Sequence, residues 1–202
     1  MNSEKFPTAK TERKSKSDAE ATPEQNSRIE NGVAAIRELN ILASQKARLV
    51  LVLAGLKPAT DVVLEQHDSS PEETERLLSQ AGLQYARVDR KLLAEDPQIA
   101  AYYAVANDPA FARELAEILS FAEKTPAQHQ RFGQLMGYPQ TAINAFAANQ
   151  TLDDETTLPQ DIVSSPFYFN LSSAHAPEEM ARIREWDDAL RRYAPDLDRG
   201  KE

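Results

Sequence analysis

Residues 49–66 read LVLVLAGLKPATDVVLEQ, and this stretch decides the fold class. The apolar run at its start is typical of a buried strand, but the residues that stop it favour a helix over 41–54. Gly55 is followed by an apolar residue and then by Pro58, the pattern of a helix that ends in a left-handed glycine. Apolar and polar residues then alternate, which predicts a strand near 59–66.

Two further strands are expected downstream, at 83–89 and 99–106. A helix that opens at Pro71 and stops at Gly82 separates the first strand from the second, so this part of the chain is expected to form a β-α-β unit. Such units favour a right-handed parallel crossover. The third strand is then expected to pair antiparallel, through the connection at 90–98.

Capping patterns mark the remaining helices. Capping boxes begin at Ser27 and Thr125, Pro109 and Pro177 stand at helix starts, and Gly137 is a further helix stop. The sequence therefore predicts a mostly helical α+β fold. Its small three-stranded mixed sheet contains the β-α-β unit and is covered by about six helices.

The chain is expected to form one main domain with flanking segments. Its first residues are polar and poor in aromatic side chains, so they cannot bury enough apolar surface to offset the entropy of ordering. The expected segments are a disordered tail at 1–26, an α/β core at 27–148, an acidic mobile connection at 149–165, an aromatic segment and C-terminal helix docked on the core at 166–195, and a frayed tail at 196–202.

Composition excludes several classes of function. The chain contains no cysteine and has a net charge of −9, so thiol chemistry is excluded and the positive footprint of a nucleic-acid-binding protein is missing. No apolar run approaches the roughly 18 residues of a membrane helix. The first residues also lack the apolar stretch of a signal peptide. We expect a cytoplasmic protein that contacts neither nucleic acid nor membrane.

The sequence contains no familiar motif for a metal, a cofactor or a catalytic nucleophile. No two of His67, His129 and His175 lie within one helical turn, and the glycine-rich phosphate loops and the GxSxG pattern are missing. The acidic runs are typical of solvated charge. We therefore expect no catalytic residue, no metal site and no cofactor.

Residues 132–143 contain the GYP triplet at 137–139 and resemble the LGYP signature of an uncharacterised prokaryotic domain-of-unknown-function family. The GLKPA stretch at 55–59 and the order of elements from about 50 to 195 are similar to the same family. The resemblance implies a fold but no activity. Family members often have cysteine just after the triplet, where this chain has Thr141-Ala142, so it implies no cysteine-based metal or redox role.

One set of residues is a candidate ligand site, because the ends of strands often face ligands in α/β proteins. These residues supply positive charge or a phenol near the strand ends and the GYP turn: Lys57, Tyr85, Arg87, Arg131 and Tyr138. They form the basis of one functional hypothesis, a small enzyme or ligand sensor that recognises an anionic small molecule. The same residues are also explained as ordinary surface charges and as residues at helix ends.

The other hypothesis is a non-catalytic binding or protein-interaction module, and the missing catalytic motifs favour it. Phe167, Tyr168 and Phe169 form the densest aromatic cluster in the chain. The last helix has an apolar stripe centred on Trp186, with helical spacing of three and four residues. A protein partner or a second copy of the chain is expected to bind through one of these surfaces, unless the stripe docks on the core.

Overall fold

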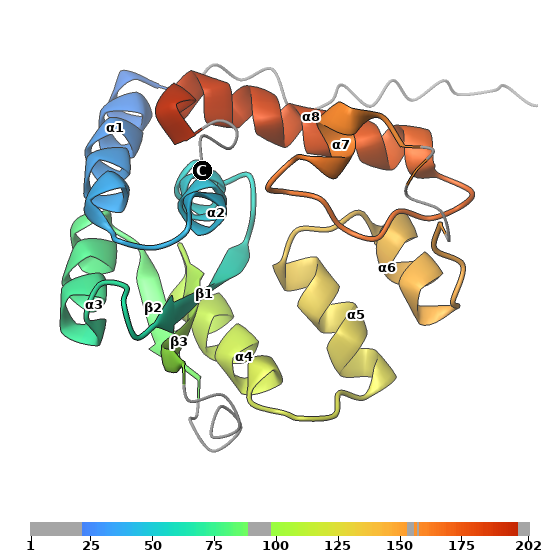
Figure 1. The fold of residues 1–202 in the computed structure, drawn as a ribbon, viewed down its shortest axis with the longest axis horizontal. Helices are drawn as coiled ribbons and strands as arrows, with labels where there is room; N and C mark the ends of the chain where they lie inside the picture. The colour runs from blue at the N-terminus through green and yellow to red at the C-terminus, as the bar shows by residue number, and fades with distance from the viewer. Residues whose placement is uncertain (1–21, 89–97, 153–155, 157, 198–202) are drawn as a thin grey trace, which may run out of the picture.

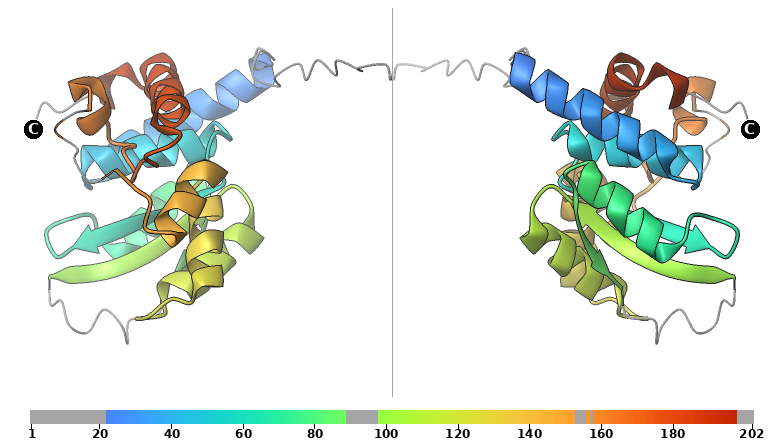
Figure 2. Two further views of the ribbon diagram at one scale, coloured as in Figure 1. Left: turned by 90° about the vertical axis from the view of Figure 1, so that its right-hand side faces the viewer. Right: turned by 90° about the vertical axis from the view of Figure 1, so that its left-hand side faces the viewer.

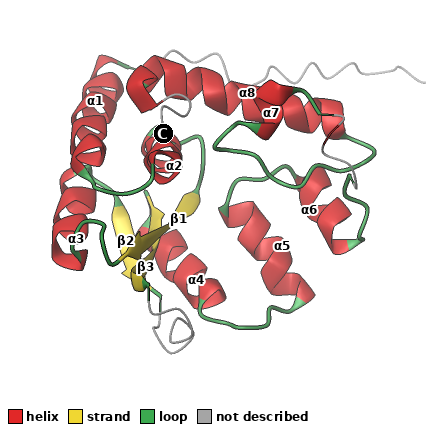
Figure 3. Ribbon diagram, viewed as in Figure 1, coloured by secondary structure: helices red, strands yellow, loops and turns green. Residues whose placement is uncertain are grey.

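A computed structural model describes residues 22–88, 98–152, 156 and 158–197. Within this part of the chain the fold is mostly helical, with one small sheet (Figures 1 and 3). In chain order the elements are α1 (Pro23–Glu38), α2 (Ala43–Leu53), β1 (Ala59–Glu65), α3 (Pro71–Gln80), β2 (Gln84–Arg87), β3 (Ile99–Ala106), α4 (Pro109–Leu119), α5 (Pro126–Leu135), α6 (Gln140–Ala147), α7 (Gln160–Val163), α8 (Ala176–Tyr193) and the 3-10 helix η4 (Pro195–Leu197).

The sheet has the strand order β1-β3-β2, and β3 is antiparallel to both neighbours. The expected α+β class is confirmed, but the expected mixed sheet is wrong because β3 lies between β1 and β2. Residues Tyr103 to Ala106 of β3 are buried on both faces, as a central strand requires, whereas β2 has exposed ends and suits an edge. The connection at 90–98 lies almost wholly outside the described residues.

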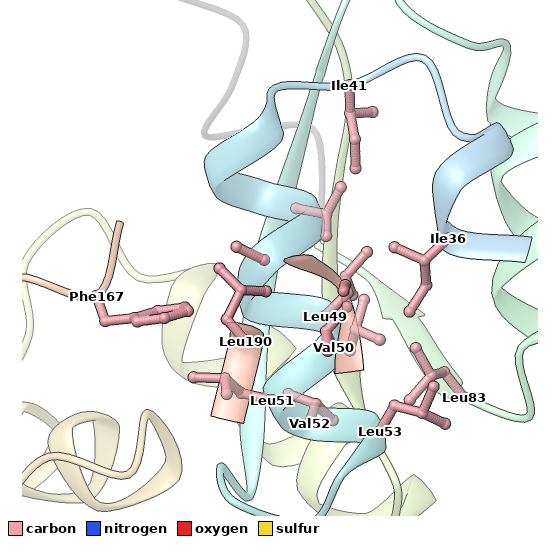
Figure 4. Packing of buried hydrophobic residues seen from close by; sticks show 14 of the residues in the cluster. Ile36, Ile41, Leu49, Val50, Leu51, Val52, Leu53, Leu83, Phe167 and Leu190 are labelled. Carbon is pink, nitrogen blue, oxygen red and sulfur yellow. The ribbon is translucent and has the colours of Figure 1, made fainter. Parts of the chain in front are cut away.

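Helices cover both faces of the sheet (Figure 2). The face formed by Val62, Leu64 and Tyr103 packs with α1, α2 and α3, and the face formed by Ala104 and Ala106 packs with α4. The helix α2 is at the centre of the larger cluster, where it touches α1, the sheet and α8 (Figure 4). Its apolar residues are therefore buried all round, which explains why its sequence also resembles a buried strand.

The first helix begins earlier than the sequence analysis predicts. Thr22 accepts a hydrogen bond from the Gln25 amide and donates its own amide to the Gln25 side chain, while Pro23 occupies the first helical position. Ser27 is therefore inside α1 rather than its cap. Residues 22–26 of the predicted disordered tail therefore belong to α1 and its cap, and residues 1–21 lie outside the described part of the chain.

The three predicted glycine stops are confirmed. Gly55, Gly82 and Gly137 have φ values of 74°, 75° and 74°, in the left-handed region. After α5, the amide of Tyr138 donates to the carbonyl of Gly133 and the amide of Gly137 donates to that of Gln134, the two hydrogen bonds of a Schellman motif. Each stop therefore turns the chain sharply at a fixed residue.

The predicted connection at 149–165 contains regular structure. The helix α7 places Ile162 in the main core, and Thr151 forms an antiparallel bridge with Ser172. Pro159 precedes this short helix, but its one buried apolar residue gives no periodic pattern from which to predict it. Residues 153–155 and 157 lie outside the described part of the chain, as do residues 198–202 of the predicted frayed tail.

Candidate functional site

A cavity of about 440 Å³ lies between α5, α6, the loop that precedes α5, and the segment at 168–170. This volume falls within the roughly 300–1,000 Å³ of small-molecule sites. Most of the wall is aromatic or aliphatic, with a few polar groups. The lining residues are Leu119, Lys124, His129, Gln130, Phe132, Gly133, Tyr138, Ala142, Ile143, Phe146, Ala147, Tyr168, Phe169 and Asn170.

Two glycines allow α5 and α6 to form this wall. A Cβ atom at Gly133 would lie 2.7 Å from Cγ1 of Ile143, so only glycine lets the two helices approach this closely. Gly137 then ends α5, and Pro139 precedes the first residue of α6. The turn between the helices leaves Tyr138 in the cavity wall, where its ring stacks on Phe169 with 5.0 Å between centroids.

Among the described residues, the polar groups that line the cavity carry no negative charge. Lys124 is the charged lining residue among those described, and its Nζ donates a hydrogen bond to the carbonyl of Phe121. The ring of His129 packs on that of Phe146, with 5.8 Å between centroids. No carboxylate lines the cavity within the described residues, although the chain has 32 Asp and Glu residues. The described lining therefore contains one positive charge and no carboxylate that would repel an anion.

Helix α8 holds the aromatic segment in place through two buried carboxylates. The Ser165 hydroxyl donates to Oδ1 of Asp187, and the Ser172 amide donates to Oε2 of Glu179. Both acidic side chains are buried. Because the two contacts are made at the two ends of residues 165–172, they position the part of that segment that lines the cavity.

Lys57 lies buried behind the cavity wall, with only 2% of the residue exposed. Its Nζ is 4.3 Å from the centroid of the Trp186 ring and 5.1 Å from that of Tyr138. No carboxylate of the described residues forms an ion pair with it. Burial, followed by the nearby charge of Arg48, lowers the pKa of Lys57 to about 7. Its amine is therefore partly neutral at physiological pH, enclosed by aromatic faces.

A polar cluster next to Lys57 contains the nearest negative charge. Asp61 accepts hydrogen bonds from Nη1 of Arg48 at 3.1 Å and from the Tyr102 hydroxyl at 3.2 Å. Burial, followed by the charge of Asp61, raises the pKa of Tyr102 and of Tyr138. Because Asp61 already has these two partners, its charge compensates Lys57 only in part.

The structure brings together two of the five predicted site residues. Lys57 and Tyr138 are in contact, but Arg131 forms a two-pronged ion pair with Glu114, at 2.7 Å for each hydrogen bond. Tyr85 and Arg87 both contact Glu75 on α3, at 3.4 and 2.7 Å. The predicted cluster is therefore divided among three places. Glu75 binds the hydroxyl of Tyr85 and the guanidinium of Arg87, and Glu114 binds the guanidinium of Arg131.

Most residues of the cavity were missed by the sequence analysis. Lys124, His129 and Asn170 belong to no motif, and Phe146 has the same helical spacing as a core residue although 48% of it is exposed. The one available signal was the pair of glycines at 133 and 137, the first inside α5 and the second at its end, which indicates a close helix–helix contact with a tyrosine beside it. Sequence spacing does not reveal that residues 168–170 complete the wall.

The surfaces proposed for a protein partner are largely buried within the chain. Phe167 and Phe169 are 2% and 6% exposed, Trp186 is fully buried, and only Tyr168 is half-buried. Both phenylalanine rings pack on the Trp186 ring, with 6.1 Å between centroids. These aromatic surfaces stabilise the contact between α8 and the core, and this structure leaves little of them for a partner.

A second hollow, of about 980 Å³, lies between α1, the end of α2 and α8. It is lined by charges of both signs, among them Arg28, Arg192, Glu185 and Asp188. Such a mixed lining is typical of a solvated surface. In the described residues there is no helix of sufficient length and apolarity to cross a membrane, and no group of three or more potential metal ligands.

Comparison of the chain with models of known protein families, with curated proteins and with solved structures found no match in any of the three. The resemblance to the LGYP family therefore stays a prediction from the residues that carry it.

Proposed function

We propose that this protein is a non-catalytic binding module that takes a small, mainly apolar molecule into the cavity between α5, α6 and residues 168–170. The observation that carries the proposal is the cavity itself, about 440 Å³ in volume and walled mostly by aromatic and aliphatic side chains. Such a wall stabilises an apolar ligand by removing its surface from water, at roughly 25 cal/mol per Å². We place this module in the cytoplasm on the sequence argument alone.

A non-catalytic role is favoured over an enzyme by the chemistry of the lining. The cavity's His129 contacts a phenylalanine ring, and its Lys124 donates to a backbone carbonyl. Within the described residues, the lining contains no serine, threonine or carboxylate that could form a nucleophile–base pair with His129. The amine of Lys57 is nucleophilic when neutral, but two aromatic rings enclose it.

Titration with N-phenyl-1-naphthylamine, a neutral dye whose fluorescence rises in apolar surroundings, tests this proposal. We expect saturable binding with one site per chain. The variant Ala147→Trp adds an indole at the exposed rim of the cavity and should weaken binding at least tenfold. Ala148→Trp is the matched control, because Ala148 is the next residue, is exposed and does not line the cavity.

Equal weakening by both variants would mean that the dye binds elsewhere or that α6 is disturbed. The far-ultraviolet circular dichroism and Tm of the two variants separate these explanations. Saturable binding that neither variant weakens would contradict the proposed site.

A further inference from the structure

We propose that the ligand of this cavity is an apolar anion, and that its binding is coupled to uptake of a proton by Lys57 behind the wall. This inference rests on the proposed function, since it names the ligand class and the regulation of the same site. It makes the module sensitive to pH: the anion would bind more tightly as the pH falls through the neutral range.

The geometry links the cavity to Lys57 through the rings that separate them. Tyr138 lines the cavity, and its centroid is 5.1 Å from Nζ of Lys57. Phe169 also lines the cavity and packs on Trp186, whose centroid is 4.3 Å from the same nitrogen. Aromatic side chains screen charge poorly compared with water, so a charge inside the cavity acts on Lys57 through a medium of low dielectric constant.

The charges around Lys57 leave it without full compensation. Arg48 on α2 and Arg182 on α8 both disfavour its charged form, and Asp61 on β1 favours it. Tyr102 on β3 donates its hydroxyl to Asp61, and Tyr138 faces the amine with its ring. With Asp61 already paired to Arg48, an anion in the cavity adds the negative charge that this region lacks.

The direction of the coupling follows from linkage. A negative charge nearby favours the protonated amine, so a bound anion raises the pKa of Lys57 above its value of about 7 in the free protein. Reciprocally, protonation of Lys57 strengthens binding of the anion by the same factor. Two unit charges about 12 Å apart in a medium of effective dielectric constant ~20 interact strongly enough to change an affinity roughly tenfold.

Two dyes with one aromatic scaffold provide the test. The first, 8-anilinonaphthalene-1-sulfonate, carries an anion that does not titrate near neutral pH, so any proton taken up on binding enters the protein. The second, N-phenyl-1-naphthylamine, lacks the sulfonate. We expect the affinity for the anionic dye to fall roughly tenfold between pH 6 and pH 8.5, while the affinity for the neutral dye stays constant.

Calorimetry in phosphate and in Tris, buffers with different enthalpies of ionisation, counts the protons directly. At pH 7.5 the anionic dye should bind with uptake of roughly half a proton, and the neutral dye with none. Lys57→Met should abolish the uptake while the neutral dye still binds. His129→Gln is the essential control, because His129 is the histidine that lines the cavity within the described residues.

Each outcome has one meaning. Uptake that is lost in Lys57→Met and kept in His129→Gln supports the inference. Binding of both dyes with no uptake, or uptake that survives in Lys57→Met, overturns it and leaves the proposed function intact. Failure of both dyes to bind overturns the proposed function itself. If Lys57→Met does not fold, the ¹³Cε resonance of Lys57 in the unaltered protein gives the answer: its titration midpoint should rise when the anionic dye is added.

Discussion

At the scale of single residues, Lys57 is a buried cation whose charge is compensated only in part. Burial of an ammonium group removes its hydration, and two aromatic faces and a shared carboxylate replace that hydration only in part. The folded protein therefore binds this proton less tightly than the unfolded chain does. Whatever its role in binding, Lys57 lowers the stability of the folded state at neutral and acidic pH.

The substitution Lys57→Met is expected to stabilise the protein. The folded pKa is about 7 and that of an unfolded lysine is about 10.4, so the unfolded state binds more protons between these values. The stability of the unaltered protein should then rise with pH across this window, by up to about 1.4 kcal/mol per pH unit from this group, and be lowest below pH 7. We expect Lys57→Met to be more stable by roughly 2–4 kcal/mol at pH 6.

Urea denaturation at pH 6 and pH 9 measures this effect, and the two stabilities of Lys57→Met should differ less than those of the unaltered protein. Measurements stop at pH 9 because burial also raises the pKa of Tyr103 to about 12, so its ionisation opposes folding at higher pH. Lys124→Met is a control, since Lys124 is half-exposed. An unchanged pH dependence in Lys57→Met would mean that the amine is hydrated in solution.

Gly137 and Gly55 form a matched pair for backbone strain. Both have φ of 74°, but a Cβ atom at Gly137 would lie 3.1 Å from Cδ of Pro58, whereas one at Gly55 would meet nothing within 4 Å. Gly55→Ala should therefore cost about 1 kcal/mol of unfolding free energy, from the left-handed conformation alone. Gly137→Ala should cost more. If thermal denaturation shows the same loss of unfolding free energy for both variants, the backbone around Pro58 moves to accommodate the new Cβ atom without strain.

The candidate site could be predicted at the residue scale only in part. Tyr138 and Lys57 stand beside helix stops that the sequence marks clearly, so their placement at turns was predictable. Their contact was not, because they are 81 positions apart in the sequence and the docking of α5 and α6 decides it. Arg131 forms an ion pair with Glu114 instead of joining them. The two residues are 17 positions apart, so no local spacing reveals this ion pair.

At the scale of elements, α8 determines the position of the aromatic segment more than that segment's own residues do. Glu179 and Asp187 are two turns apart on the buried face of α8, and each accepts a hydrogen bond from one end of residues 165–172. The ring of Trp186 fills the space between α8, Phe167 and Phe169. One helix face therefore supplies both the polar anchors and the apolar support of the cavity wall.

Truncation of one anchor should loosen the wall. Glu179→Ala leaves the buried amide of Ser172 without its acceptor, which should lower the unfolding free energy by roughly 1–3 kcal/mol. Glu178→Ala is the matched control, since Glu178 is exposed in the same turn, and it should change stability by less than about 0.5 kcal/mol. Similar losses in the two variants would show that helix-end charge, rather than the hydrogen bond, is what matters.

The positions of the strands could be predicted from the sequence, but their order in the sheet could not. All three strands were located, because their apolar runs are bounded by clear stops. Their order was not, since nothing within β1 or β2 shows that β3 will lie between them. A crossover that skips one strand has the same local sequence as one that does not. The short helix α7 was missed because its one buried apolar residue, Ile162, forms no periodic pattern.

At the scale of the whole molecule, the cavity lies where two parts of the fold meet. The sheet with α1 to α4 forms one part, and α5 and α6 form the other (Figure 1). Helix α8 contacts α2 and α1, and the segment that precedes it reaches the α5–α6 turn through the stacking of Tyr138 on Phe169. The volume of the cavity therefore depends on how α8 docks.

Trp186, the one tryptophan of the chain, reports this docking. Because it is fully buried, its emission should be blue-shifted, resistant to quenching by iodide and unchanged when the protein is diluted from about 100 µM to about 0.1 µM. Trp186→Ala should cost roughly 3–5 kcal/mol, as other large core truncations do. Emission that shifts to the red on dilution would instead place this helix in an interface between two copies of the chain.

Binding of an apolar small molecule in the cavity between α5, α6 and residues 168–170 is the basis of the proposed function. The most direct test is a ¹H–¹⁵N correlation spectrum recorded during titration with N-phenyl-1-naphthylamine. We expect saturable shifts confined to amides around the cavity, including Gly133, Phe146 and Asn170, with little change at Arg28 or Arg192 in the second hollow. Shifts that gather at the second hollow, or that spread over the chain without saturating, would contradict the proposed function.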